Sequence, residues 1–252
     1  MNDSRNEVSM VLEKYGFFSG PIQAFASDAE VKKLIWYFRN GNLEPFEKPD
    51  AYIKVDNSIL IIEHFAINGY EAFPDGGSKL QRNERQLDQK LEKLSEGQKA
   101  EYLTSQIGVT NSYQGFIDNC IARFSNHYQK IQSYKERLQE ENIANDGTDF
   151  KVCFLMEDVS PLGTLTHDGE RTRPVVLAQS EEFLDFYTEM NEVDWVISAI
   201  PDFPYGYSPY LLSHKYIPQC REQVLDYANY QFLEGNCMRT DIMGALNIPP
   251  QE

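Results

Sequence analysis

The sequence predicts an α/β fold, in which a mixed β-sheet is flanked by helices on both faces. Two segments, 149–158 and 193–200, contain unbroken apolar runs, as expected of strands that are covered on both faces. A third segment, 47–69, consists of two apolar runs joined at Asp56-Asn57, a pair that suits a tight turn. Helical patterns separate these strands along the chain, and this alternation is typical of α/β proteins.

The composition is that of a globular chain with a strong acidic excess. The 252 residues are 41% hydrophobic and 13% aromatic, and the formal net charge is -16. This length fits a single domain, with a core at about 28–200 and a C-terminal helical extension at about 201–252. The acidity argues against a broad basic face for nucleic acid, whereas a local groove with metal ions is compatible with it.

Several absences in the sequence bear on where the protein acts. The N-terminus has no apolar signal segment, and no run of about 18 apolar residues occurs. We therefore expect a cytoplasmic protein without a membrane partner, and the sequence indicates no oligomeric state. The cysteines have no metal-type spacing and fit free thiols in a reducing compartment; they are Cys120, Cys153, Cys220 and Cys237.

Helices are predicted on both sides of the hairpin segment. Ser27 and Glu30 fit a capping box, and apolar residues recur at helical spacing up to Gly41. His127 and Tyr134 lie near one face of a long predicted helix, where they could line a groove or cap the edge of the core. The further predicted helices cover about 79–95, 114–141, 180–190 and 220–235.

The hairpin places two acids opposite each other. With a turn at Asp56-Asn57, counting outward pairs Asp50 with Glu63 in a rung where Cβ atoms lie about 4.5–5.5 Å apart. Opposed carboxylates repel, and a divalent metal ion would remove this cost. In the alternative interpretation the strand ends before Asp50, since Pro49 favours strand starts and edges, and the acids are unrelated.

Pro49-Asp50, the turn, and the apolar strand that ends in Glu63 together resemble the PD-(D/E)XK nucleases, the restriction-endonuclease-like superfamily. The capped helix before them, and the helix and the "VCFLMED" strand after them, fit its αβββαβ core over roughly residues 28–200. The chain is also similar to uncharacterised bacterial and phage proteins with an "IEHF" strand. The resemblance implies that Asp50 and Glu63 hold Mg²⁺ or Mn²⁺, with Glu30 as a weaker accessory acid.

The chain departs from this family at one position. The resemblance calls for a lysine two residues after Glu63, and Phe65 stands there. His64 points to the opposite strand face and cannot replace it. Lys79, after the "GGS" loop, is the preferred substitute. Lys48 is the second choice, because its position in the strand pairing depends on whether that pairing continues past Pro49.

The resemblance implies a metal-dependent nuclease that hydrolyses DNA phosphodiester bonds, with nucleic acid as its partner. The missing lysine supports an alternative, a catalytically degenerate member of the fold that binds protein or nucleic acid. In a third interpretation, the chain is an α/β enzyme of another class and the hairpin acids are incidental. A lysine ammonium within a few ångströms of the two acids would favour the nuclease over the binding module.

Overall fold

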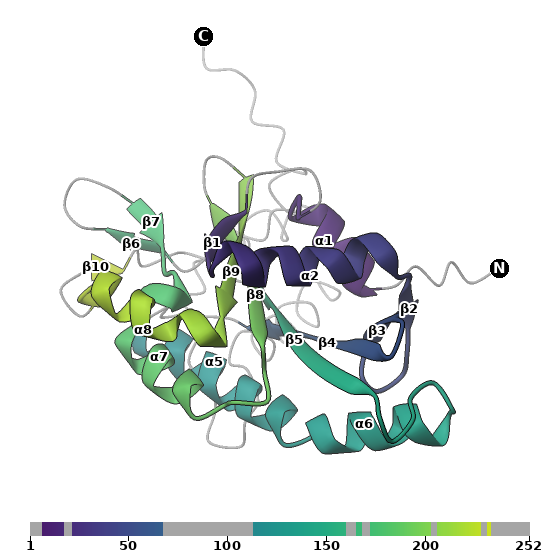
Figure 1. The fold of residues 1–252 in the computed structure, drawn as a ribbon. Coiled ribbons are helices and arrows are strands. Elements are labelled where there is room, and N and C mark those ends of the chain that lie inside the picture. The colour runs from purple at the N-terminus through teal and green to yellow at the C-terminus, as the bar shows by residue number, and fades with distance from the viewer. Residues whose placement is uncertain are drawn as a thin grey trace, which may run out of the picture.

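The computed structural model describes residues 7–17, 22–67, 113–159, 165–167, 172–202, 206–227 and 231–232. Its centre is a mixed seven-stranded sheet in the order β1-β9-β8-β5-β4-β3-β2, beside a small sheet in the order β10-β6-β7 (Figure 1). The strands of the large sheet are β1 (Gln23–Phe25), β2 (Leu43–Pro45), β3 (Ala51–Val55), β4 (Ser58–Ile67), β5 (Asp149–Asp158), β8 (Trp195–Asp202) and β9 (Gly206–Ser213). The small sheet contains β6 (Leu165–His167), β7 (Thr172–Pro174) and β10 (Gln231–Phe232). The predicted α/β class is confirmed.

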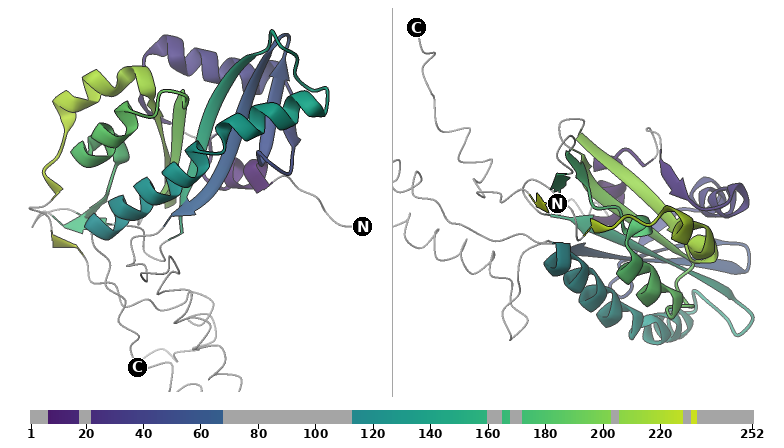
Figure 2. Two further views of the ribbon diagram at one scale, coloured as in Figure 1. Left: turned by 90° about the horizontal axis from the view of Figure 1, so that it is seen from below. Right: turned by 90° about the vertical axis from the view of Figure 1, so that its left-hand side faces the viewer.

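Helical layers cover both faces of the large sheet, as Figure 2 shows from two sides. On one face lie α1 (Glu7–Lys14) and α2 (Asp28–Asn40). Their buried side chains form a core with the strand side chains that point to this face. On the other face lie α5 (Tyr113–Tyr128), α6 (Ile131–Glu140), α7 (Glu181–Thr188) and α8 (Ile217–Cys220). The short 3₁₀ turns are η1 (Leu177–Gln179), η2 (His214–Tyr216) and η3 (Arg221–Gln223).

The apolar run of β4 divides between these two cores. Ile59 and Ile61 pack under α5 and α6, whereas Leu60 and Ile62 pack under α1 and α2. Burying each such side chain contributes about 1.5–3 kcal/mol, so a strand covered on both sides must be apolar at consecutive positions. Side chains at the far end of β4 therefore point alternately into the two layers, and this alternation separates Glu63 from His64.

The hairpin has the predicted turn and register. Asp56 has a positive φ of 53°, which an Asp tolerates, and Val55 pairs with Ser58. The last pair in the antiparallel ladder joins Ala51 and Ile62. β4 then lies parallel to β5, so the hairpin is adjacent to the 149–158 strand as predicted.

The predicted helix at 114–141 is wrong as a single element. It is divided into α5 and α6, because Lys130 N donates to the carbonyl of His127, three residues back, and tightens the turn. The segment N-terminal to this turn keeps its helical bond, since Gln129 N donates to Ser125 O. Predicted helix 79–95 lies outside the described residues.

The C-terminal part differs from its prediction. Residues 206–213 are not part of a helical extension but form β9, between β1 and β8 in the large sheet. The predicted helix at 220–235 is also wrong over its described part, because the α-helix ends at Cys220 and residues 224–226 are not helical. Leu225 N donates to Gln179 O, and Tyr227 OH accepts from Val176 N, and these bonds hold the chain away from a helical path.

Within the described ranges, none of the helices combines the length and the apolar character that a membrane crossing requires.

Candidate functional site

Asp50 and Glu63 meet where β3 begins. The backbone N–H of Asp50 donates to Glu63 Oε2 at 3.4 Å, and Asp50 Oδ2 accepts from His64 N at 2.7 Å. In the register of this ladder the next bonded pair would join Pro49 and His64. The ladder instead ends at the pair Ala51 and Ile62, and the free N–H of His64 donates to the Asp50 carboxylate. The strand thus ends before Asp50, yet the two acids still adjoin.

Glu63 is held by two donors from the helical layer above it. Only 8% of its side chain is exposed, and its Oε1 accepts from Tyr134 OH and from His127 Nδ1, both at 2.6 Å. These bonds offset the cost of placing a carboxylate in an apolar layer. Burial and the bond to Glu63 raise the pKa of Tyr134 far above its usual value, so its hydroxyl stays a donor. His127 and Tyr134, predicted as accessory residues, therefore do reach the site.

The ring of Phe65 packs against the imidazole of His127. The two rings are stacked, with centroids 4.5 Å apart and an interplanar angle of 7°. Phe65 also meets Phe154 edge-on at 5.5 Å, so its own orientation is fixed by the core. Phe65, which stands in the lysine position, thus supports the imidazole of His127 by stacking. It lies on the same strand face as Glu63.

The two acids are close enough for the charge of Glu63 to act on Asp50. Burial, and next the charge of Glu63, raise the pKa of Asp50, while the bond from His64 N acts in the opposite direction. Within the part of the chain that the structure describes, neither carboxylate forms an ion pair with a lysine or an arginine. A cation placed between Asp50 and Glu63 would relieve this repulsion.

The donor set fits Mg²⁺ better than a structural zinc ion. Glu63 Oε1 has two donors and Asp50 Oδ2 has one. The oxygens with the most capacity for a cation are therefore Glu63 Oε2, which accepts only the 3.4 Å bond from Asp50 N, and Asp50 Oδ1. Among the described residues, no group of three or more His, Cys, Asp or Glu is arranged to hold a metal ion. Mg²⁺ is commonly bound by one or two carboxylates, with water and substrate oxygens completing its shell, whereas structural zinc takes four protein ligands.

A second polar cluster lies on the opposite face of β4. Glu157 accepts from Tyr15 OH at 2.6 Å and pairs with Lys14 at 2.7 Å. His64 Nε2 lies 3.3 Å from Glu157 Oε2, and His64 Nδ1 lies 3.4 Å from Glu7 Oε1. The bond from His64 and the bonds from Lys14 and Tyr15 lower the pKa of Glu157 to about 2. This cluster attaches α1 to the sheet, and the sequence offered no spacing signal for it.

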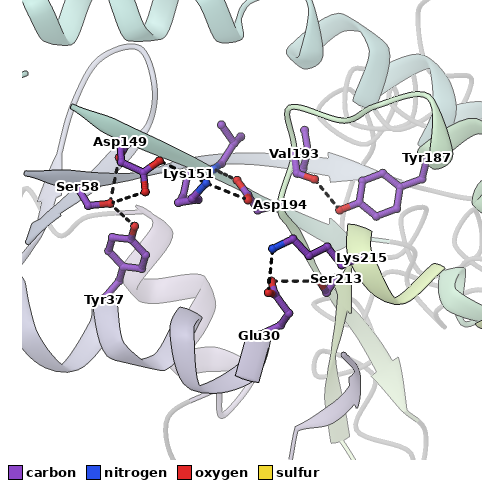
Figure 3. A network of polar contacts seen from close by, with 11 residues as sticks. Glu30, Tyr37, Ser58, Asp149, Lys151, Tyr187, Val193, Asp194, Ser213 and Lys215 are labelled. Carbon is purple, nitrogen blue, oxygen red and sulfur yellow. Dashed lines mark hydrogen bonds and ion pairs between the residues drawn. The ribbon is translucent and has the colours of Figure 1, made fainter. Parts of the chain in front are cut away.

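The Glu30 carboxylate contacts residues other than Asp50 and Glu63. Ser27 Oγ accepts from Glu30 N at 3.3 Å, so the predicted cap is present, but the Glu30 carboxylate pairs with Lys215 at 3.2 Å and accepts from Ser213 Oγ at 3.5 Å. Figure 3 shows these three side chains at the end of β9. In its described contacts Glu30 therefore supports the fold rather than the paired acids.

The same view contains a second network that binds α2 to the sheet. Tyr37 OH lies 2.5 Å from Ser58 Oγ, and Lys151 lies 3.4 Å from Asp149 and 3.6 Å from Asp194 (Figure 3). These residues join the helix to the first residues of β4 and β5 and have no contact with Asp50 or Glu63 in the structure as described.

Of the two predicted lysines, Lys48 has no contact with the acids in the structure as described. Lys48 is exposed in the connection that Phe46 N closes by donating to Asp50 O, and the ladder does not extend to it. The pairing past Pro49 that would bring Lys48 across from Phe65 is therefore not formed. Lys79 lies outside the described residues.

No protein-family model matches the chain, and neither a curated protein nor a solved structure matches it significantly.

Proposed function

We propose that the chain is a Mg²⁺- or Mn²⁺-dependent nuclease that hydrolyses DNA phosphodiester bonds at Asp50 and Glu63. The observation that carries this proposal is the adjacency of the two acids. The backbone N–H of Asp50 donates to Glu63 Oε2, and burial and the charge of Glu63 raise the pKa of Asp50. Such a pair, without a described lysine or arginine, favours a divalent cation.

The order of elements supports the same proposal. Among the described elements, α2, β2, β3 and β4 are followed by the helices α5 and α6 and then by β5, which is parallel to β4. This is the αβββαβ order that the resemblance to the restriction-endonuclease-like nucleases implies. Asp50 directly precedes β3 and Glu63 lies within β4, which is where the motif residues of that family would fall.

Asp50 and Glu63 would hold the metal ion, which when bound polarises the phosphodiester and makes water a stronger nucleophile. His127 and Tyr134 hold Glu63 Oε1, so the carboxylate keeps one orientation with Oε2 on the side of Asp50. The chain has a net charge of -16 and would repel DNA at long range. The attraction between the protein and DNA must then be local. A metal ion bound at the two acids would supply it.

The test is a cleavage assay on single- and double-stranded DNA with Mg²⁺, with Mn²⁺ and with EDTA. We expect cleavage with either metal, none with EDTA, and a loss on the order of 100-fold or more in Asp50→Asn and Glu63→Gln. Glu47→Gln is the matched control, because Glu47 is an exposed acid in the same connection and should leave cleavage unchanged. Full activity in both site variants would refute the proposal.

A second candidate is a catalytically degenerate module that binds nucleic acid or protein. Phe65 in the lysine position favours it, as does the nearly complete burial of Glu63. This candidate predicts metal-independent binding without cleavage. Binding of labelled DNA in EDTA, together with no cleavage under any metal, would select it over the nuclease.

A further inference from the structure

We propose that the outer side of α2 binds single-stranded DNA, with Trp36 stacking on a base and with Lys32 and Arg39 contacting neighbouring phosphates. The choice of DNA as the partner rests on the proposed function, but the binding does not require cleavage. Three observations carry the inference: the alignment of these residues on the helix, the exposure of the tryptophan, and the absence of a described carboxylate partner for either cation.

The three side chains form one stripe along α2. Trp36 follows Lys32 by four residues and precedes Arg39 by three, and residues at these spacings are neighbours on a helix surface. Leu34 and Tyr37, the buried residues of α2, belong to the core between this helix and the sheet. The stripe lies on the other side, where all three of its residues are exposed, and α2 is at the outside of the fold (Figure 1).

Trp36 is held in an exposed position by a buried neighbour. It is 39% exposed, whereas Trp195, the second of the chain's two tryptophans, is fully buried. The ring of Trp36 lies edge-on to that of Tyr37, with centroids 5.0 Å apart, and Tyr37 is only 1% exposed. The exposed part of the indole can therefore stack on a base without first being ordered. Aromatic stacking of this kind suits a single strand, whose bases are accessible and need not be specific.

The cations of the stripe have no acid beside them in the same part of the helix. The acids of α2 are Asp28 and Glu30, both in its first turn, and Glu30 pairs with Lys215. Within the described residues, neither Lys32 nor Arg39 forms an ion pair. In a chain with a net charge of -16, this local positive charge favours an anionic partner such as a phosphate backbone.

A role in helix stability accounts for only part of the pattern. A cation in the last turn interacts favourably with the carbonyl groups there, which explains Arg39. Lys32 lies in the first half of the helix, where this effect is absent, and tryptophan at position 36 is only an average helix former. Lys33 is half-buried and close enough to Asp194 for its charge to act on it, so we do not count Lys33 in the stripe.

The experiment measures binding of labelled oligothymidine of about 12 nucleotides, by fluorescence anisotropy in EDTA. Trp36→Ala should bind about 10–100-fold more weakly. The slope of log affinity against log salt should become shallower by about 0.7 in Lys32→Ala and in Arg39→Ala, because each loses one phosphate contact. Lys130→Ala is the matched control, since Lys130 is an exposed cation outside α2, and it should change neither quantity.

Tryptophan fluorescence gives an independent readout of the same binding. Oligothymidine should quench the emission of the wild type, because Trp36 is exposed, and should leave the emission of buried Trp195 unchanged. Trp36→Phe should therefore show no quenching although it still binds, and it serves for the affinity comparison if Trp36→Ala does not fold. The duplex of the same strand should bind more weakly than the single strand, since its bases are already stacked.

The outcomes separate this surface from the nuclease proposal. If the wild type binds the single strand in EDTA and the α2 variants lose that binding, the surface stands whether or not DNA is cleaved. If the α2 variants bind as tightly as the wild type, or the wild type does not bind in EDTA, the inference is overturned, while cleavage with Mg²⁺ keeps the nuclease proposal.

Two further results would assign the surface to another partner and overturn the inference. Tighter binding of the duplex, or equal competition by polyglutamate, would mean that charge alone is recognised. A dimer of the wild type that dissociates in Trp36→Ala, measured by light scattering, would mean that the stripe contacts a second copy of the chain.

Discussion

His127 and Tyr134 donate to the same oxygen of Glu63 from opposite sides of the break between α5 and α6. They are separated from Glu63 by 64 and 71 residues in the sequence, and both bonds are 2.6 Å long. Although the helix is interrupted between them, both side chains point from the helical layer toward β4. The two helices together thus fix one strand residue, whose other oxygen faces Asp50.

Tyr134→Phe should loosen this arrangement without emptying the core. It removes one donor to a buried carboxylate, and we expect unfolding free energy to fall by about 1–3 kcal/mol. Mn²⁺ affinity should fall by about 10–100-fold, because a carboxylate without its supporting bond is less well oriented. Denaturant unfolding and calorimetry measure the two effects. Tyr128→Phe, which removes a 3.3 Å bond to Asn191 near the surface, should change neither.

Asp50→Asn should stabilise the protein while abolishing its function. The pKa of Asp50 is raised in the folded state, so its ionised form costs stability above that pKa, and the cost disappears as the pH falls through it. An amide oxygen can still accept from His64 N. We expect a gain on the order of 1 kcal/mol at pH 7 that shrinks toward acid pH. The measurement is denaturant unfolding at several pH values. An equal gain in Asp146→Asn, at an exposed acid, would contradict this explanation.

Glu157→Gln should destabilise the protein in a pH-dependent way. The pKa of Glu157 is lowered from 4.5 to about 2, so its contribution is complete above about 4.5 and is lost as the pH falls toward 2. We expect a loss of about 2 kcal/mol at pH 7 and a small difference near pH 2, after discounting for partial solvent screening. Glu192→Gln, which breaks the exposed pair with Lys135, should cost less than about 1 kcal/mol. A loss that is constant across this pH range would contradict the role of the Glu157 charge.

Phe65→Leu separates the packing role of Phe65 from its stacking role. Leucine keeps most of the apolar volume, so unfolding free energy should fall by only about 1–2 kcal/mol. The imidazole of His127 loses its stacking partner, and cleavage should fall by about tenfold or more, because small misplacements at a reacting centre are costly. Steady-state cleavage and thermal unfolding distinguish the effects. Cleavage that follows stability alone, as in a matched Phe183→Leu variant of the core, would refute the stacking role.

The sequence predicts the hairpin well because its signals are local. The turn at Asp56-Asn57 and the period of the flanking residues determine the register, and counting from the turn brings Asp50 to Glu63. The sequence could not predict that the ladder ends at Ala51, because this depends on how the Asp50 carboxylate replaces a backbone acceptor.

The parts that were not predicted depend on tertiary contacts. No glycine or proline marks the break after Tyr128, so helical periodicity continues through it in the sequence. The segment after η3 has helical periodicity as well, but Tyr227 is held by Val176 N and stacks on Tyr113 at 5.1 Å. The stack of His127 on Phe65 joins an α5 residue to a strand, and no spacing in either segment indicates it.

The uninterrupted pairing of β4 with β5 has a consequence for how the protein opens. The two strands pair from Ser58 and Asp149 to Ile67 and Asp158, between two helical layers. Amides in such a region exchange with deuterium only through the largest opening events, whereas strand edges exchange through local fraying. Glu63 belongs to that slow unit and Asp50 to its edge. The strand pairing around Glu63 should therefore persist in partially unfolded states, whereas the segment that carries Asp50 should detach first.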